Sequence, residues 1–180
     1  MTSKRARRTA RGRNAAPQVE VLVGSPQWRR RRHAASLVRK AIRTAALIAG
    51  GARSTRRAGL AILLTDDSAI RALNRDWRKR NAATNVLSFP ARSFSARSLR
   101  GRSPRHLGDI VIAYETVARE AVIEGKPFGH HLVHLAVHGY LHLLGHDHAT
   151  EREADRMERL EIDILARLGV PDPYRGTLPV

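Results

Sequence analysis

Apolar side chains recur along this chain with two periods, which predict a domain built from both helices and strands. Short apolar or alternating runs bounded by glycine, proline or acidic residues predict strands over residues 18–23, 59–65, 84–90 and 107–113. Apolar residues three and four positions apart predict helices over residues 27–49, 66–77, 114–124, 128–144 and 150–168. This order predicts one α+β domain with a roughly four-stranded mixed sheet and about five helices, mainly on one side of the sheet.

Three segments lack the apolar side chains that a core requires. Residues 1–16 hold six Lys or Arg and no acid, and we expect a basic, disordered tail there. Residues 91–106 hold five arginines and no acid, which indicates a basic flexible loop. We assign residues 17–172 to a single domain and residues 173–180 to a C-terminal tail. An acid-free, arginine-bearing start is also typical of an organellar transit peptide, but clear amphipathic periodicity is missing, so we expect a cytoplasmic protein.

The net charge of +17 is spread unevenly along the chain. Residues 1–108 carry 26 Lys or Arg and four acids, whereas residues 109–180 carry seven and twelve. The strongly basic first part of the chain indicates a polyanionic partner, and we expect nucleic acid. A GC-rich genome is the alternative, since 29 of the 33 basic residues are arginine, but codon bias does not explain the scarcity of acids.

The composition also excludes several classes of protein. There is no cysteine, which rules out disulfides, Fe–S clusters and cysteine nucleophiles. A metal site would therefore consist of histidines and carboxylates. No apolar run approaches the ~20 residues that a membrane-spanning helix needs, so we expect no membrane partner.

Residues 138–148, H-G-Y-L-H-L-L-G-H-D-H, place histidines at the spacing of metal ligands. His138 and His142 lie one turn apart on the same face of a predicted helix, and Gly145 can take the left-handed conformation that ends it. His148 follows three residues later. Three neutral imidazoles suit one zinc ion and leave a fourth position for water, which is typical of a catalytic rather than a structural site.

Other histidines surround this set. His146 competes with His148 for the third position, and the H-x-x-x-H-x-x-G-x-x-H frame favours His148. His134 lies one turn before His138, where it either supports a ligand or packs as a polar residue. We place His130 and His131 at the surface, as solvated residues or weak RNA contacts.

The same frame occurs in metzincin proteases, which makes a metalloprotease an alternative function. Those enzymes need a glutamate directly after the first histidine as general base. That position is Gly139 here, and no Met-turn is evident because Met157 suits a helix core. The missing base argues against proteolysis.

The histidine motif, T-N-V-L-S-F-P at 84–90 and L-G-D-I-V-I at 107–112 together resemble the YbeY family of bacterial and organellar endoribonucleases. The resemblance covers about residues 60–165. It implies an α+β fold, zinc bound by His138, His142 and His148, and a functional arginine at Arg78, in the segment L-N-R-D-W-R. It also implies cleavage of single-stranded RNA, maturation of the 3′ end of 16S ribosomal RNA and ribosome quality control, with the small ribosomal subunit as partner.

Three features depart from the family pattern. His146 stands where an aromatic residue is usual, and Asn81 and Ala83 replace an aspartate and a proline. The 91–106 loop is basic where family members are often acidic, which affects the choice of RNA. None of these changes removes a predicted ligand.

These patterns predict a zinc-dependent endoribonuclease with Arg78 and His138 as catalytic residues. Zinc lowers the pKa of bound water towards ~7 and polarises a phosphoryl oxygen, and a guanidinium matches the charge that develops on phosphorus. Asp109 and Asp147 are further candidate carboxylates, although Asp109 can instead orient a strand end and Asp147 can accept an imidazole N–H. The alternative from another class is a non-catalytic, zinc-containing RNA-binding protein associated with the ribosome.

Overall fold

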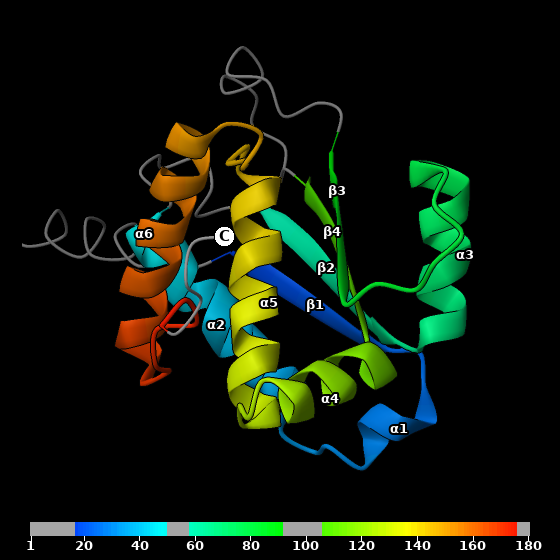
Figure 1. Ribbon diagram of the computed structural model, residues 1–180. Coiled ribbons are helices and arrows are strands. Elements are labelled where there is room, and N and C mark those ends of the chain that lie inside the picture. Colours follow the sequence, from blue (N-terminus) through cyan, green and yellow to red (C-terminus); the bar gives the residue numbers. More distant parts are fainter. Residues whose placement is uncertain (1–16, 50–57, 92–105, 176–180) are drawn as a thin grey trace, which may run out of the picture.

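The computed structural model describes residues 17–49, 58–91 and 106–175, and its centre is a four-stranded mixed sheet (Figure 1). The strands are β1 (Gln18–Val23), β2 (Gly59–Thr65), β3 (Val86–Pro90) and β4 (His106–Ala113). Their order across the sheet is β1-β2-β4-β3. Strands β1, β2 and β4 are parallel to one another, and β3 runs antiparallel to β4 at the edge of the sheet. The predicted α+β class and mixed sheet are confirmed.

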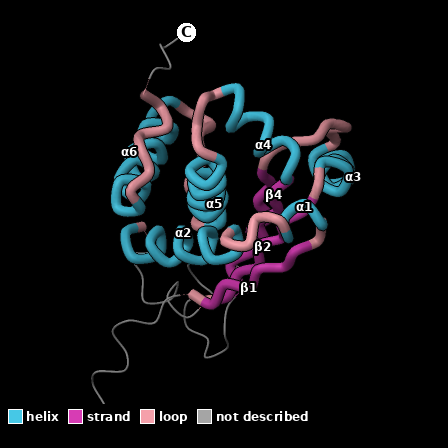
Figure 2. The backbone as a smooth tube through the Cα atoms, turned by 90° about the horizontal axis from the view of Figure 1, so that it is seen from below, coloured by secondary structure: helices cyan, strands magenta, loops and turns pink. Residues whose placement is uncertain are grey.

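Six helices surround the sheet in the part of the chain that the structure describes. They are α1 (Pro26–Arg29), α2 (Ala34–Ile48), α3 (Asp67–Arg78), α4 (Tyr114–Ile123), α5 (Phe128–Leu143) and α6 (Glu151–Leu168). Seen from below, α2, α5 and α6 gather on one side and α3 lies on the opposite side (Figure 2). The prediction that helices lie mainly on one side therefore agrees with the structure.

The single helix predicted over residues 27–49 is wrong, because the chain breaks after Arg29. In a continuous helix Trp28 would lie about 80° around the axis from Val38, away from the apolar stripe. The break buries Trp28 instead, and its indole Nε1 donates to the carbonyl oxygen of Thr65 at 2.7 Å. The short helix α1 is thus anchored at the end of β2, and α2 lies across the face of the sheet.

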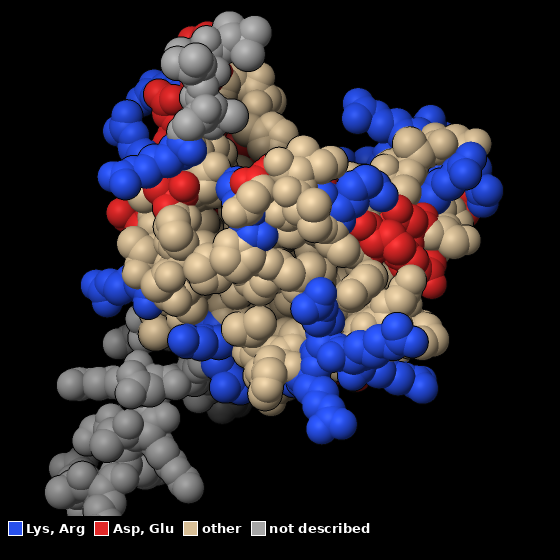
Figure 3. Space-filling view, turned by 60° about the horizontal axis from the view of Figure 1, so that its bottom comes forward, with Lys and Arg blue, Asp and Glu red and all other residues tan. Residues whose placement is uncertain are grey.

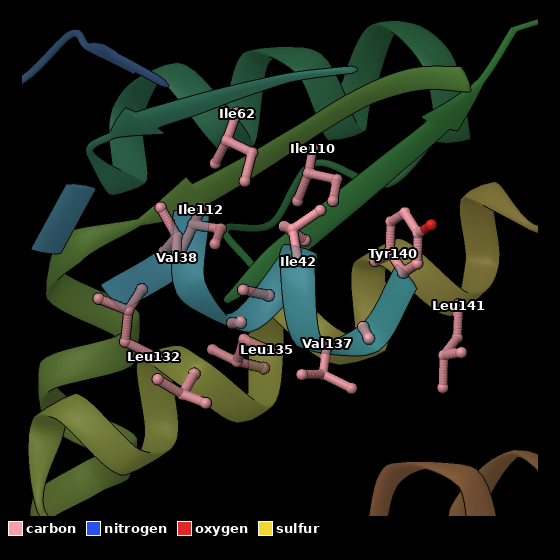
Figure 4. Packing of buried hydrophobic residues seen from close by; sticks show 14 of the residues in the cluster. Val38, Ile42, Ile62, Ile110, Ile112, Leu132, Leu135, Val137, Tyr140 and Leu141 are labelled. Atoms are coloured by element: carbon pink, nitrogen blue, oxygen red, sulfur yellow. The ribbon is translucent and has the colours of Figure 1, made fainter. Parts of the chain in front are cut away.

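The sheet has a hydrophobic core on each face, and alternate residues of strand β4 belong to each of them. Ile110 and Ile112 point into the main core, where they pack with side chains of α2 and α5 (Figure 4). Val111 and Ala113 point to the other face and pack with Ile70 of α3. This alternation follows from the period of two in a strand, and both faces are apolar because helices cover both.

The ends of the last two helices carry the turn chemistry that the sequence indicates. Gly145 has φ +88°, the left-handed conformation expected for the residue that turns the chain after α5. Thr150 and Glu153 form a capping box at the start of α6, which fixes where that helix begins. The 145–150 turn is therefore defined on both sides.

Several expectations concern the remaining segments. The basic tail at 1–16 and nearly all of the 91–106 loop lie outside the described residues. Pro173 and Tyr174, assigned from the sequence to a tail, contact the domain: Lys126 Nζ donates to the carbonyl oxygen of Pro173 at 3.1 Å. Among the described helices, none combines the length and apolar character needed to cross a membrane.

Candidate metal centre

Three imidazoles meet at the C-terminal end of α5. One ring nitrogen from each of His138, His142 and His148 lies within 4.8 Å of the others, so this group can hold a metal ion. The Nε2 atoms of His138 and His142 are 3.1 Å apart. Two ligands at about 2.0–2.1 Å from one tetrahedral ion are separated by roughly 3.3 Å, so the pair fits a shared zinc ion without rearrangement.

A buried carboxylate on α6 holds the first of these imidazoles. Glu161 is fully buried, and its Oε1 accepts a hydrogen bond from Nδ1 of His138 at 2.8 Å. Its Oε2 accepts from Nε2 of His134 at 2.9 Å and from the hydroxyl of Tyr174. With its hydrogen on Nδ1, His138 presents the Nε2 lone pair towards His142.

Electrostatics favour an ionised Glu161 and a neutral His142. Burial alone would raise the pKa of Glu161, but hydrogen bonds and positive charge from His134 and His138 outweigh it and bring the pKa to about 2. Burial, followed by the positive charge of His138 and His148, lowers the pKa of His142. An ionised acceptor and neutral imidazoles are the forms in which histidine binds metal.

Glu161 is not among the site residues predicted from the sequence. Met157, Glu161, Ile164 and Leu165 are the buried residues of α6, and they follow helical spacing. A lone acid in the apolar stripe of an amphipathic helix was thus the available signal. His134, left open between two roles, contacts the same carboxylate.

A cleft of about 750 Å³ opens beside the three imidazoles. Its lining includes Arg78 and Arg80 from the end of α3 and the following loop, and residues of β3. Arg78 Nη2 donates to the carbonyl oxygen of Ser88 at 3.2 Å, which places the guanidinium against the edge strand. Arg78 and the histidines, 60 residues apart along the chain, therefore border one cleft.

The T-N-V-L-S-F-P motif positions this strand. Asn85 donates from Nδ2 to Glu120 of α4 at 3.0 Å, and its Oδ1 accepts from the backbone N–H of Val86 at 2.6 Å. Ser88 Oγ donates to the carbonyl oxygen of Gly139 at 3.2 Å. The motif thus joins the edge strand to α4 and to the helix that carries the imidazoles.

The two candidate carboxylates differ. Asp147 borders the cleft, and its Oδ1 lies 3.9 Å from Nδ1 of His142. Asp109 does not border the cleft; its exposed carboxylate accepts from Nε2 of His106 at 2.8 Å. A role for Asp109 at the centre is therefore wrong, and the alternative of ordering a strand end fits.

The histidines outside the group of three differ in their surroundings. His146 is not part of the group of three, although it borders the cleft, and burial followed by the charge of Arg156 lowers its pKa. The surface placement of His131 is wrong: it is buried, with Nε2 bonded to Glu120 at 2.8 Å. His130 is half-buried. The helix turns His131 towards α4, which spacing alone does not show.

Gly139 explains why a protease base is missing. A Cβ at this position would meet Ile110 Cγ2 and Ser88 Oγ at 3.0 Å, so α5 approaches the sheet closely here. A glutamate at 139 would point into the sheet and not into the cleft. The packing of α5 is therefore incompatible with the metzincin arrangement.

Comparisons with known proteins agree with this geometry. A family model described as Endoribonuclease YbeY matches residues 26–169. Endoribonuclease YbeY of Rhodopseudomonas palustris (strain BisA53) is 54% identical over 158 residues, which are 88% of this chain and 90% of that protein. The protein of the same name from Nitrobacter winogradskyi is 53% identical over 162 residues, 90% of this chain and 84% of that one.

A solution structure of a Thermotoga maritima protein shares the fold. It has a TM-score of 0.55 and 16% identity, and the match covers 91% of this chain and 99% of that one. At this identity the likeness concerns the fold alone. The family model extends over nearly the whole domain, including every residue of the cleft described above, and the two relatives match 88% and 90% of the chain. The chain therefore belongs to the YbeY endoribonuclease family.

Proposed function

We propose that this protein is a zinc-dependent endoribonuclease that cuts single-stranded RNA in ribosomal RNA processing. One observation carries the proposal: the three imidazoles and the Arg78 guanidinium border the same cleft. Family membership supplies the reaction class, hydrolysis of phosphodiester bonds in RNA. We assign His138, His142 and His148 as ligands of one zinc ion, and Arg78 and His138 as catalytic residues.

The size and charge of the cleft support a single-stranded substrate. A volume of about 750 Å³ is on the scale of a small-ligand site, which admits about one or two unpaired nucleotides but no base-paired helix. Arg78 and Arg80 supply positive charge on the wall formed by α3 and its following loop. A phosphodiester held by these cations faces the imidazoles.

Different residues of the cleft have different roles in the proposed reaction. Zinc, when bound, supplies a water of lowered pKa and polarises a phosphoryl oxygen. Arg78 places a guanidinium beside the phosphate, where its planar donors match two oxygens. Glu161 keeps the hydrogen of His138 on Nδ1, and the partial burial of His142 lowers its pKa and so favours the neutral imidazole.

Within the cell we assign the activity to maturation of the 3′ end of 16S ribosomal RNA and to ribosome quality control, in the cytoplasm. The family supports this assignment, and the basic first half of the chain supports association with RNA of the small ribosomal subunit.

The test is cleavage of a labelled single-stranded RNA by metal-free protein, before and after zinc is added, together with metal analysis. We expect zinc to restore cleavage in the wild type but not in His138→Ala, which should also lose bound zinc. Arg78→Ala should retain zinc and lose about a hundredfold or more in rate, as for other groups that stabilise developing charge. Arg75→Ala is the matched control, since Arg75 is on α3 but pairs with Asp76 and does not border the cleft.

Two results would contradict the proposal. Full cleavage by metal-free protein would remove the role of zinc. Binding of RNA without cleavage, after zinc is restored and contaminating nucleases are excluded, would favour the non-catalytic RNA-binding alternative.

A further inference from the structure

A second basic surface lies where α1 meets α2. We call it the basic junction, and it consists of exposed cations at the end of α1, in the following turn and on α2: Arg29, Arg30, Arg31, Arg32, Lys40 and Arg43. The sequence has no Asp or Glu between Val21 and Thr65. Within the described residues, none of these six cations has an ion-pair partner.

The cations lie on adjoining elements. The exposed positions of α2 are Ser36, Lys40, Arg43 and Leu47, and spacings of four, three and four place them on one side of the helix. Seen with the bottom of the molecule turned forward, Lys and Arg occupy the lower part of the face, and further Lys and Arg lie at its upper left and upper right (Figure 3). Like charges repel at this density, so the surface is suited to a polyanion.

The α1 end of the basic junction, at Arg31, is remote from the metal centre. The guanidinium carbon of Arg31 lies 4.5 Å from the centre of the Phe128 ring, at the first residue of α5. His142 is 14 residues further along the same helix, which corresponds to about 21 Å at a rise of 1.5 Å per residue. A phosphate held at Arg31 therefore cannot be the one in the cleft.

The junction also lacks the aromatic surface on which unpaired bases stack. Trp28 is buried, and Phe128 is half-buried beneath Arg31. Proteins that hold single strands rely on exposed aromatic rings, whereas base-paired RNA is held through its phosphates and its shape. The arginines thus fit the backbone of a helical RNA segment.

We propose that the basic junction binds a base-paired RNA segment, remote from the single strand that enters the cleft. This extends the proposed function, since it takes the polyanion to be RNA. One molecule would then hold a structured substrate at two places, and the separation of about 21 Å would limit how far from a helix the cut can fall. Linking two contacts in this way raises affinity without any new contact in the cleft.

The experiment compares two double variants of the full chain that change the net charge equally. Arg30→Glu with Arg32→Glu alters the junction, and Arg71→Glu with Arg167→Glu alters exposed arginines of α3 and α6 that border neither surface. Binding of a hairpin RNA is measured by fluorescence anisotropy over a range of salt. Cleavage of a short single-stranded RNA is measured in parallel.

We expect the junction variant to bind the hairpin roughly tenfold or more weakly than the control variant, with a salt slope reduced by about two. Its cleavage of the short RNA should stay within about twofold of the control, because the cleft is unchanged. If the glutamate pair lowers the melting temperature, Arg30→Gln with Arg32→Gln replaces it.

Three outcomes would overturn the proposal. Equal hairpin affinity of the two variants would show that only overall charge matters. A parallel loss of short-RNA cleavage would make the junction part of the cleft. Loss of binding to anionic phospholipid vesicles, with hairpin binding intact, would assign the surface to a membrane. Hairpin binding is measured without cleavage, so it is decided separately from the proposed nuclease activity.

Discussion

Replacing Glu161 by leucine removes the acceptor that orients His138. Three donors, from His134, His138 and Tyr174, then face an apolar side chain inside the protein. A buried polar group without a partner costs about 1–3 kcal/mol, and breaking one partner of a buried charged network costs about 3–5 kcal/mol. We expect the metal-free variant to lose stability in the second range.

Zinc affinity should fall as well, because nothing then holds the hydrogen of His138 on Nδ1. Loss of a carboxylate that supports a metal-binding histidine typically weakens the metal site by about 10–100-fold, or roughly 1.4–2.8 kcal/mol. Glu161→Gln keeps the shape and one acceptor oxygen, so we expect a loss of less than about tenfold. The order wild type, glutamine, leucine is thus the expected ranking.

The assay is competition with a chelating dye for zinc, with thermal unfolding of the metal-free proteins alongside. Asp163→Asn is the matched control, since this exposed residue lies two positions further along α6. A folded Glu161→Leu protein that binds zinc as tightly as the wild type would refute the orienting role of the carboxylate. The glutamine variant keeps the test open if the leucine variant fails to fold.

Three further predictions concern stability. Gly139→Ala should cost about 1–3 kcal/mol in thermal or urea unfolding, because its Cβ would lie 3.0 Å from both Ile110 and Ser88; an unchanged midpoint would contradict the close packing of α5. Tyr140→Phe should leave stability unchanged or raise it by about 1 kcal/mol, because the buried hydroxyl has no partner among the described residues; a clear loss in urea unfolding would reveal an interaction of that hydroxyl. The pKa of Glu161 in the folded protein, about 2, lies below the ordinary value of 4.5, so the unfolded chain takes up this proton first and stability falls as pH drops between these values. Wild type should therefore lose up to about 3 kcal/mol over this range that Glu161→Gln does not lose, and parallel pH profiles would contradict the assignment.

Local patterns predicted those parts of the molecule that local geometry determines. The spacing of His138 and His142 and the left-handed Gly145 depend only on near neighbours along the chain. The strands were also predicted, because burial between helices gives each of them a short apolar run that is visible in the sequence. Family motifs added Arg78, which spacing alone does not distinguish from the other arginines.

Features that depend on packing between distant segments were not predictable in the same way. The break after Arg29 exists because Trp28 must reach the end of β2, and the burial of His131 depends on Glu120 of α4. Glu161 is the clearest case. Its position in an apolar stripe was visible, but its three donors come from α5 and from the segment after α6, and only the fold brings them together.

The segment after α6 has a practical consequence for work on this protein. The Tyr174 hydroxyl donates to Glu161, so the chain near residue 174 takes part in holding His138. A protease that trims the chain before this tyrosine, or an affinity tag fused directly behind it, disturbs a residue that supports the proposed metal site. Preparations that differ only at this end should therefore differ in zinc content, and intact mass is the measurement to make before their activities are compared.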